Sequence, residues 1–368
     1  MCQLKSGIIL KNRVFVPEYD SHTQMLEELG IKDDYFNASK TFVRVELSPT
    51  DGDAFSDIDT WKLSVDQDIT PEWYDEDRYK PQVVEAVKEW AKDHIHIGVD
   101  DLKISTGRNH YIEDCKGVDI CGSATVKYIC GSATVEYICG SATVKNICDS
   151  ATVKNICDSA TVEYICGSAT VEYIRGSATV EYICGSATVE YIRDIATVEY
   201  ICGRATVKNI CDSATVKNIC DSATVKNICG SATVEYIRGS ATVEYIRDSA
   251  TVEYICGRAT VKNICGSATV KNICGSATVE YIRGSATVKN ICGSATVKNI
   301  CDSATVKNIC DSATVENAKG LSVIIGSRYG WSKKDALVLT ENATFKDRQT
   351  KTIYQSGDWK LINVTEEK

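Results

Sequence analysis

The residue best placed for nucleophilic chemistry is Cys2. If Met1 is removed, Cys2 becomes N-terminal, and its own α-amine can act as the base for an attack by the thiol. His22, in the segment Asp20-Ser21-His22, is a second candidate base. The same segment is also a natural N-cap for a following helix, because a serine or aspartate oxygen accepts backbone N–H bonds there. Cys2 and His22 are therefore our catalytic candidates, and we expect a helix to begin at this segment.

Three further histidines are candidate metal ligands. His94, His96 and His110 precede Cys115, but their spacing matches no known ligand pattern for zinc. We expect a polar strand edge here rather than a metal centre. No glycine-rich phosphate loop, hydrolase serine motif or calcium-binding glycine-aspartate repeat is present. The sequence predicts neither a metal nor a cofactor.

The chain has 19 cysteines, and 17 of them occupy one position of a repeat. The other two are Cys2 and Cys115. An odd number of cysteines without a signal peptide favours free thiols in a reducing compartment. In a stack of strands these cysteines would lie about 4.8 Å apart, which is within the Cα range of a disulfide. We therefore expect oxidative cross-linking in air.

The repeat is a nine-residue unit that begins as Cys-Gly-Ser-Ala-Thr-Val-Lys-Tyr-Ile at 121–129 and recurs without insertion to Ala318. These 198 residues contain 22 units. A helical hairpin repeat needs 30 or more residues, whereas a β-solenoid needs only a strand and a corner. The fold class that we predict is mainly β: a parallel β-solenoid, or β-helix, with two units per coil.

The pattern within a unit predicts which side chains are buried. Ala124 and Val126 alternate with polar residues, and Ile129 follows at the next corner, so we expect these three inside a narrow core. Gly122, replaced in other units by aspartate, supplies the turn. The first position carries arginine in five units, which an apolar interior would not accept unpaired. The cysteines at that position should therefore lie at a corner, partly accessible to solvent.

Positions seven and eight vary together, as Glu-Tyr in some units and Lys-Asn in others. We expect a patterned face in which one run of units forms an acidic, aromatic band and the next run forms a basic, amide band. The alternative is block duplication of two repeat versions with no role in binding. The candidate binding residues are Glu163, Tyr164, Glu172, Tyr173, Glu181, Tyr182, Glu190, Tyr191, Glu199, Tyr200, Lys208, Lys217 and Lys226.

The segments beside the array differ from it in composition. Residues 1–114 read as a small α+β domain, with a hairpin over 7–16, a helix over 21–29 and strands over 42–47 and 61–65. A second helix begins near Pro71 or shortly after and is clearest over 82–93. Residues 115–318 form the solenoid, with 115–120 as a degenerate first strand. Residues 319–368 are β-rich capping coils, with strands over 321–326, 336–339 and 359–364. Such caps protect the terminal edges of a solenoid.

Charge and hydropathy narrow the choice of partner. Residues 1–120 have 25 acidic and 14 basic side chains, the repeats are nearly neutral, and no segment has the basic stripe that phosphate contacts require. We therefore expect no nucleic-acid partner. The chain has no apolar stretch of membrane-spanning length and no secretory signal, so we expect a cytoplasmic protein without a membrane partner. The oligomeric state does not follow from the sequence.

Met1-Cys2, Asp20-Ser21-His22, the stretch 57–73 and the Ser-Ala-Thr-Val array together resemble a family of uncharacterised proteins from bacteria and their phages. The resemblance covers essentially the whole chain, implies an origin in a phage or prophage, and implies no activity. Met1-Cys2 is also similar to the start of glutamine amidotransferases, but Gln3 departs from their Met-Cys-Gly pattern.

Three hypotheses of function follow. The first is a non-enzymatic structural or interaction protein, a rigid rod that presents its patterned face to an unknown protein partner. The second is an enzyme in the front domain, with Cys2 as nucleophile. The third is an inhibitor of a host nucleic-acid enzyme, whose acidic surface mimics DNA. Near-identity of the units suits a spacer of variable length better than a catalytic groove.

Overall fold

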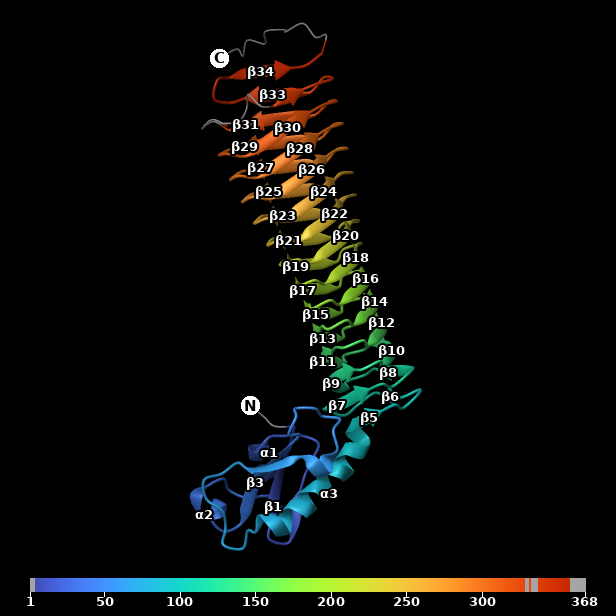
Figure 1. Cartoon of the computed structure of the whole chain (residues 1–368), viewed down its shortest axis with the longest axis vertical. Coiled ribbons are helices and arrows are strands. Elements are labelled where there is room, and N and C mark those ends of the chain that lie inside the picture. Colours follow the sequence, from blue (N-terminus) through green and yellow to red (C-terminus); the bar gives the residue numbers. More distant parts are fainter. Residues whose placement is uncertain (1–3, 328–330, 332–336, 358–368) are drawn as a thin grey trace.

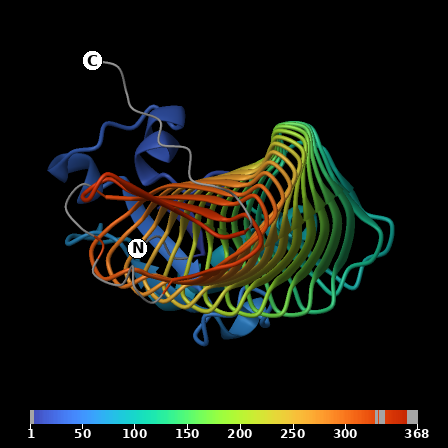
Figure 2. The same ribbon diagram turned by 90° about the horizontal axis from the view of Figure 1, so that it is seen from above.

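The chain folds into a small front domain joined to a long rod (Figure 1). This computed structural model describes residues 4–327, 331 and 337–357. The front domain contains the helices, and the rod consists of stacked turns of β-strand. Seen from above, successive turns overlap with a small progressive displacement (Figure 2). Within the described residues, no helix is long and apolar enough to cross a membrane.

The front domain is built on a four-stranded antiparallel sheet of order β2-β1-β3-β4. Its strands are β1 (Lys5–Leu10), β2 (Arg13–Phe15), β3 (Phe42–Ser48) and β4 (Lys62–Val65), and its helices are α1 (His22–Glu28), α2 (Tyr35–Ala38), η1 (Ile58–Thr60) and α3 (Glu76–His94). The predicted hairpin and both helices are present. The second helix begins at Glu76, shortly after Pro71, because the Asp75 side chain accepts the N–H of Asp77 and caps the helix there.

Period-2 alternation along β1 directs neighbouring side chains to opposite faces of this sheet. Ile8 packs with Met25 and Leu26 of α1, whereas Ile9 packs with Val83 and other residues of α3. The sheet therefore lies between two small cores, with α3 covering the larger one. Tyr111, which belongs to the rod, is buried in the α3 core, so the two parts of the chain are packed together.

The rod is a parallel β-solenoid, as the repeat predicted, and it has about 14 turns between residues 95 and 347. Two units make one turn, because each strand pairs with the strand two places along the chain. Within the array the register offset is 18 residues, as in Thr125 opposite Thr143. From β5 to β33 the strands consequently alternate between two sheets, which we call the odd sheet and the even sheet after their strand numbers. The one exception among the described strands is β34, which belongs to the odd sheet.

The odd sheet consists of β5 (Ile95–Ile97), β7 (His110–Glu113), β9 (Thr125–Cys130), β11 (Thr143–Ile147), β13 (Thr161–Ile165), β15 (Thr179–Ile183), β17 (Thr197–Ile201), β19 (Thr215–Ile219), β21 (Thr233–Ile237), β23 (Thr251–Ile255), β25 (Thr269–Ile273), β27 (Thr287–Ile291), β29 (Thr305–Ile309), β31 (Val323–Gly326), β33 (Thr344–Asp347) and β34 (Thr352–Gln355). The even sheet consists of β6 (Lys103–Ile104), β8 (Val118–Ile120), β10 (Thr134–Ile138), β12 (Thr152–Ile156), β14 (Thr170–Ile174), β16 (Thr188–Ile192), β18 (Thr206–Ile210), β20 (Thr224–Ile228), β22 (Thr242–Ile246), β24 (Thr260–Ile264), β26 (Thr278–Ile282), β28 (Thr296–Ile300), β30 (Thr314–Ala318) and β32 (Val338–Leu339).

The inward residues of both sheets form one continuous core. Ala124, Val126 and Ile129 are fully buried, as are their equivalents in the units that follow. Between valine and isoleucine two successive residues, such as Lys127 and Tyr128, face outward, so the strand bends instead of alternating strictly. The predicted interior is confirmed, and this bend is what places both variable positions on the surface.

Left-handed backbone at the second position of each unit makes the corner. Gly122 has φ +62°, and the aspartates that replace glycine, such as Asp149 and Asp221, have φ +55° and +56°. Glycine adopts this region freely and aspartate tolerates it, which explains the choice of residue. The N–H of Ala124 donates to the carbonyl of Cys121 at 3.3 Å and closes the turn.

The rod begins earlier than the repeat. Val118–Ile120 is a strand, as predicted, but β5, β6 and β7 precede it and stack in the same two sheets. Their turns are shorter, with Ile95 opposite Tyr111 and Lys103 opposite Asp119, an offset of 16 residues. These turns do not share the nine-residue period of the repeat, so the repeat pattern does not reveal them.

At the other end, the predicted strands over 321–326 and 336–339 correspond to β31 and β32, which continue the parallel pairing. The predicted strand over 359–364 lies outside the described residues. The last strand of the described residues, β34, turns back and pairs antiparallel with β33. It therefore lies along the outer edge of β33, where another turn of the solenoid would otherwise add.

Candidate interaction surface and reactive groups

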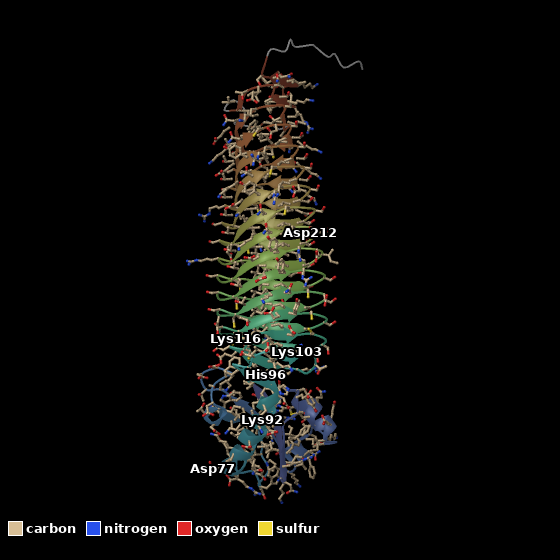
Figure 3. All side chains as sticks on the ribbon, turned by 90° about the vertical axis from the view of Figure 1, so that its right-hand side faces the viewer. Asp77, Lys92, His96, Lys103, Lys116 and Asp212 are labelled. Atoms are coloured by element: carbon tan, nitrogen blue, oxygen red, sulfur yellow. The ribbon has the colours of Figure 1, made fainter. Side chains whose placement is uncertain are left out.

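The outward side chains at positions seven and eight form ladders that run along the rod, on both of its sheets. Figure 3 shows side chains projecting from the rod along its length. Because sequential units alternate between sheets, the block from Glu163 to Tyr200 is not one band. Its members on the odd sheet are Glu163, Tyr164, Glu181, Tyr182, Glu199 and Tyr200, and its members on the even sheet are Glu172, Tyr173, Glu190 and Tyr191. The basic residues divide in the same way, with Lys217 on the odd sheet and Lys208 and Lys226 on the even sheet.

Tyrosine rings stack along each sheet. The ring centroids of Tyr164 and Tyr182, and of Tyr182 and Tyr200, are 5.0 Å apart with planes inclined by 9°. Tyr173 and Tyr191 stack at 5.3 Å on the even sheet. Three successive turns of the odd sheet thus present one near-parallel aromatic stack, bordered by the carboxylates of position seven. We call this surface the tyrosine ladder.

Lysine and glutamate form ion pairs between turns. Glu199 and Lys217 pair at 2.5 Å, Glu136 and Lys154 pair at 2.7 Å, and Glu190 pairs with Lys208. Further pairs join Glu244 to Lys262 and Glu253 to Lys271. Each pair joins residues 18 positions apart, so the boundary between a Glu-Tyr block and a Lys-Asn block is attractive. These pairs are exposed and contribute little to stability.

The asparagines of position eight form amide ladders. Asn227 donates to the side-chain oxygen of Asn209 at 3.0 Å, and Asn290 donates to Asn272 at 3.0 Å. The amide can also donate to the backbone of the preceding turn, as Asn209, which follows Tyr191, does to the carbonyl of Glu190 at 3.4 Å. Tyrosine at position eight interacts with its neighbours by ring stacking and asparagine by amide hydrogen bonds, so the repeat accommodates either residue.

The repeat cysteines lie at the corners as free thiols, and most are partly exposed, in agreement with the sequence prediction. Burial is the main reason that the pKa of Cys166, Cys202 and Cys274 rises to about 11. These thiols are protonated at neutral pH. Since the thiolate is the nucleophilic form, they are poor nucleophiles.

The eight corner aspartates have a structural role that the sequence did not predict. Each carboxylate accepts the N–H of the residue 18 positions earlier, as Asp221 accepts that of Gly203 at 3.1 Å and Asp194 accepts that of Gly176 at 2.9 Å. Figure 3 labels one of them, Asp212, at the side of the rod. The full set is Asp149, Asp158, Asp194, Asp212, Asp221, Asp248, Asp302 and Asp311. These hydrogen bonds satisfy corner N–H groups, so the carboxylates support the fold.

Both ring nitrogens of the catalytic candidate His22 have partners. Nδ1 lies 3.0 Å from a carboxylate oxygen of Asp66, and Nε2 lies 3.1 Å from the carbonyl oxygen of Val45. Ser21 accepts the N–H of Gln24, which confirms the predicted N-cap. Cys2 lies outside the described residues, so the structure does not place it against His22. Near His22, the carboxylate of Glu46 has its pKa raised by burial and by Asp66.

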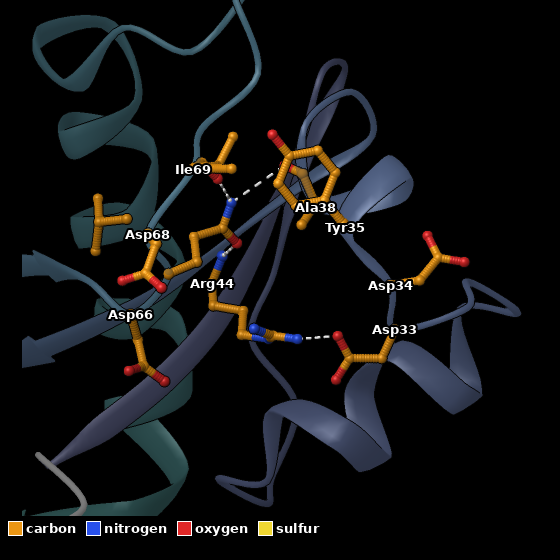
Figure 4. A pocket seen from close by; sticks show the side chains of 10 residues that line it. Asp33, Asp34, Tyr35, Ala38, Arg44, Asp66, Asp68 and Ile69 are labelled. Carbon is orange, nitrogen blue, oxygen red and sulfur yellow. Dashed lines mark hydrogen bonds and ion pairs between the residues drawn. The ribbon is translucent and has the colours of Figure 1, made fainter.

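Beside this histidine is an open pocket of about 710 Å³ on the front domain (Figure 4). The Arg44 side chain crosses the pocket and pairs with Asp33. The Gln67 side chain accepts the backbone N–H of Arg44 and donates to the backbone carbonyl of Ile69, and so links two walls of the pocket. The other polar groups that line it are Asp34, Tyr35, Asp66 and Asp68. Carboxylates outnumber the single guanidinium, so the pocket suits a cationic or neutral group. No sequence motif marks it, because its residues come from α2, β3 and the segment that follows β4.

The other histidines form a stacked column at the junction between the front domain and the rod, not the polar strand edge that we expected. Trp90 stacks on His94 at 4.6 Å, His94 stacks on His110 at 5.3 Å, and His110 stacks on His96 at 5.5 Å. His94 and His110 are buried. Cys115 donates its S–H to the carbonyl of His96 rather than joining an imidazole cluster. The column packs the junction.

No protein-family model, no curated protein and no solved structure matches this chain. The geometry of the rod therefore carries the functional argument. The ladders are the most extensive regular feature of the described surface. The sequence pattern identified the residues of the ladders but not their division between two sheets. That division could have been inferred, because two units make one turn and successive units must then lie on opposite sheets.

Proposed function

We propose that this protein is a non-enzymatic structural and interaction protein. In this proposal the solenoid is a rigid spacer, and its tyrosine ladder binds an unknown protein partner. The observation that carries the proposal is that both sheets present regular ladders of outward side chains and share one continuous core. Repeat solenoids commonly serve as extended binding surfaces.

Rigidity is supported by the core and by the junction with the front domain. Buried alanine, valine and isoleucine connect each turn to both of its neighbours, from Ile104 to Phe345. At the junction, Lys5 is fully buried and donates to Asp20 at 2.7 Å, and Asp20 also accepts from Asn109 at 3.0 Å. Tyr111 lies in the α3 core and stacks on Tyr128, 6.0 Å away. The front domain is thereby held in one orientation on the rod.

The chemistry of the tyrosine ladder indicates the kind of partner. Tyrosine gives large contact area at low entropic cost and is enriched at protein interfaces. Glu163, Glu181 and Glu199 flank the odd-sheet ladder, and Lys217 follows on the next turn. A partner with an apolar or planar strip bordered mainly by basic side chains would complement this surface. The acidic net charge of residues 1–120 adds long-range attraction for such a partner.

The test uses substitutions that the repeat already contains. In one variant Tyr164, Tyr182 and Tyr200 are replaced by asparagine, and in the matched control Tyr173 and Tyr191 of the even sheet are replaced in the same way. Partner capture from host extract, quantified by mass spectrometry, should fall in the first variant and persist in the second. Equal capture by wild type and both variants would overturn the role of the odd-sheet ladder, provided that circular dichroism shows intact folding.

The resemblance to phage-associated proteins implies, within this proposal, that the gene lies in a phage or prophage, which the neighbouring genes would test. The same proposal places the protein in the reducing cytoplasm, in line with its free thiols. The enzyme hypothesis rests on Cys2, and a Cys2→Ala variant that keeps the biological effect of the wild type would remove it. The DNA-mimic hypothesis gains no support from the rod, because its glutamates pair with lysines between turns.

A further inference from the structure

The corner cysteines are arranged in two straight ladders, one at each edge of the rod. The corner that follows the odd-sheet strands carries ten cysteines and one arginine, each 18 residues from the next. In order they are Cys130, Cys148, Cys166, Cys184, Cys202, Cys220, Arg238, Cys256, Cys274, Cys292 and Cys310. We call this the odd-corner ladder. Arg238 separates its last four thiols from the rest.

Neighbouring thiols among these last four interact through their side chains. Cys274 interacts with both Cys256 and Cys292, and Cys292 interacts with Cys310. The sulfurs of Cys292 and Cys310 and a carboxylate oxygen of Asp311 all lie within 4.8 Å of one another. All four thiols are free and partly exposed. Soft donor atoms that an ion can reach are therefore already held side by side.

The straight ladder limits how many of these sulfurs one ion can bind. Successive turns of a parallel sheet are about 4.8 Å apart, so alternate cysteines are separated by about 9.6 Å. Zn–S bonds are about 2.3 Å long, which allows an ion to bridge two neighbouring sulfurs but not a third in the same line. A tetrahedral site of four thiolates cannot be assembled here. The geometry favours an ion that accepts two sulfur ligands.

We propose that adjacent cysteines of the odd-corner ladder bind monovalent copper, with each ion held between the thiolates of two consecutive turns. Thiolate ligands select this soft cation. In the run from Cys256 to Cys310, the pairs Cys256 with Cys274 and Cys292 with Cys310 take one ion each. Each binding event releases two protons, forms two Cu–S bonds and leaves copper in the monovalent state.

This site is independent of the proposed interaction function. It lies at the corner of the rod, whereas the tyrosine ladder lies on the outward surface of a sheet. A rod that binds a partner only through tyrosine would retain that binding after the cysteines are replaced, so failure of one proposal leaves the other standing.

The experiment compares two variants with the same number of thiols. Cys256→Ser with Cys274→Ser leaves Cys292 and Cys310 adjacent, whereas Cys274→Ser with Cys292→Ser leaves Cys256 and Cys310 three turns apart. The fully reduced full-length chain is titrated anaerobically with Cu(I) against bicinchoninate, and bound ions are counted by native mass spectrometry. We expect the first variant to lose one ion relative to wild type and the second to lose two. Equal losses would overturn the proposal.

Two further measurements keep the result decisive. If a serine variant does not fold, the same pairs are replaced by arginine, which five units carry naturally at this position. X-ray absorption at the copper edge should show two sulfur neighbours for each ion. Three or four sulfur neighbours would overturn the two-coordinate site even if the ion counts agree.

Discussion

Glu199 and Lys217 are 18 residues apart in the chain, yet their charged groups lie 2.5 Å apart on neighbouring turns of the odd sheet. Lys217 also interacts electrostatically with Glu235 on the following turn of the odd sheet. It therefore separates two glutamate blocks that would otherwise form one column of like charges. Such columns repel, because like charges directly opposite one another in a sheet are destabilising.

Reversing the charge of Lys217 should lower thermal stability. Lys217→Glu places a carboxylate between Glu199 and Glu235, and because the groups are exposed the loss should shrink in high salt. Lys226→Glu is the matched control, since its even-sheet neighbours along the ladder are Lys208 and Glu244. We expect little or no loss there. Melting curves at low and high salt would test this, and equal shifts in both variants would contradict the inter-turn pairing.

Truncating a core side chain should lower the free energy of unfolding far more than truncating an equally large exposed side chain. Ile201 is fully buried, whereas Ile195, which replaces the usual serine, is 62% exposed. Ile201→Ala should lower the free energy of unfolding by about 2–5 kcal/mol. Ile195→Ala should change it by about 0.5 kcal/mol or less. Hydrogen exchange of the neighbouring turns is the preferred measurement, because long repeat arrays depart from two-state unfolding.

The corner at Asp221 should tolerate asparagine and glycine but not valine. Its φ of +56° lies in the left-handed region, where an ordinary L-residue costs roughly 1–2 kcal/mol and a β-branched one more. Asp221→Asn keeps an oxygen that can accept the N–H of Gly203, and Asp221→Gly keeps only the backbone freedom. Thermal midpoints should follow the order Asn, Gly, Val. A valine variant as stable as asparagine would show that this backbone angle is wrong.

The histidine column should make the junction sensitive to acid. Burial, followed by the nearby His110 and His94, lowers the pKa of His96 from 6.5 to about 4, with Asp93 opposing the shift. A folded-state pKa below the unfolded value means that the unfolded chain binds more protons over this range. The stability that neutral His96 contributes is therefore fully present above pH 6.5 and is lost as pH falls from 6.5 towards 4.

His96→Gln should reduce that pH dependence. The fluorescence of Trp90, whose ring stacks on His94, gives a local readout of unfolding, followed at pH 7 and at pH 4.5. His110, which burial also shifts to a lower pKa, remains in the variant and should leave a smaller residual effect. An unchanged difference between the two pH values would mean that His96 does not titrate as described.

Deleting repeat units should distinguish one unit from one turn. Residues 211–219 and 220–228 have identical sequences. Deleting 211–228 removes a whole turn, so the rod should shorten by about 4.8 Å with every later strand still in its original sheet. Deleting 211–219 alone should also fold, because both sheets bury the same residues, but it should move every later strand to the opposite sheet.

Small-angle scattering measures the length after each deletion, and a bulky label after Ala318 reports the side of the rod. The label should keep its side in the 18-residue deletion and change side in the nine-residue deletion. Retention of the same side in both variants would contradict the two-unit turn.

Much of this architecture was predictable because each unit repeats the same local physics. Ala124, Val126 and Ile129 mark the interior by their apolar character, and Gly122 marks the corner by its backbone freedom. With nine residues per unit and a narrow core, two units per turn also followed. Ser21 as a helix cap followed from its side chain and its place before a helical pattern.

What only the tertiary structure decided are the contacts between residues that no short sequence pattern relates. The turns from β5 to β7 have a 16-residue offset and lack the repeated motif, and the histidine column joins α3 to the first turns of the rod. The carboxylate of Asp221 reaches a backbone N–H one turn earlier. These depend on which strands become neighbours in space.

The same distinction applies to the surface. The sequence alone determined that Glu-Tyr and Lys-Asn units occur in blocks and that their side chains face outward. Folding places successive units on different sheets, because one turn consumes two units, and so it divides each block and makes the residue 18 positions away the true neighbour. That is why Glu199 pairs with Lys217 on the odd sheet, while Lys208, closer in the chain, lies on the even sheet and pairs with Glu190.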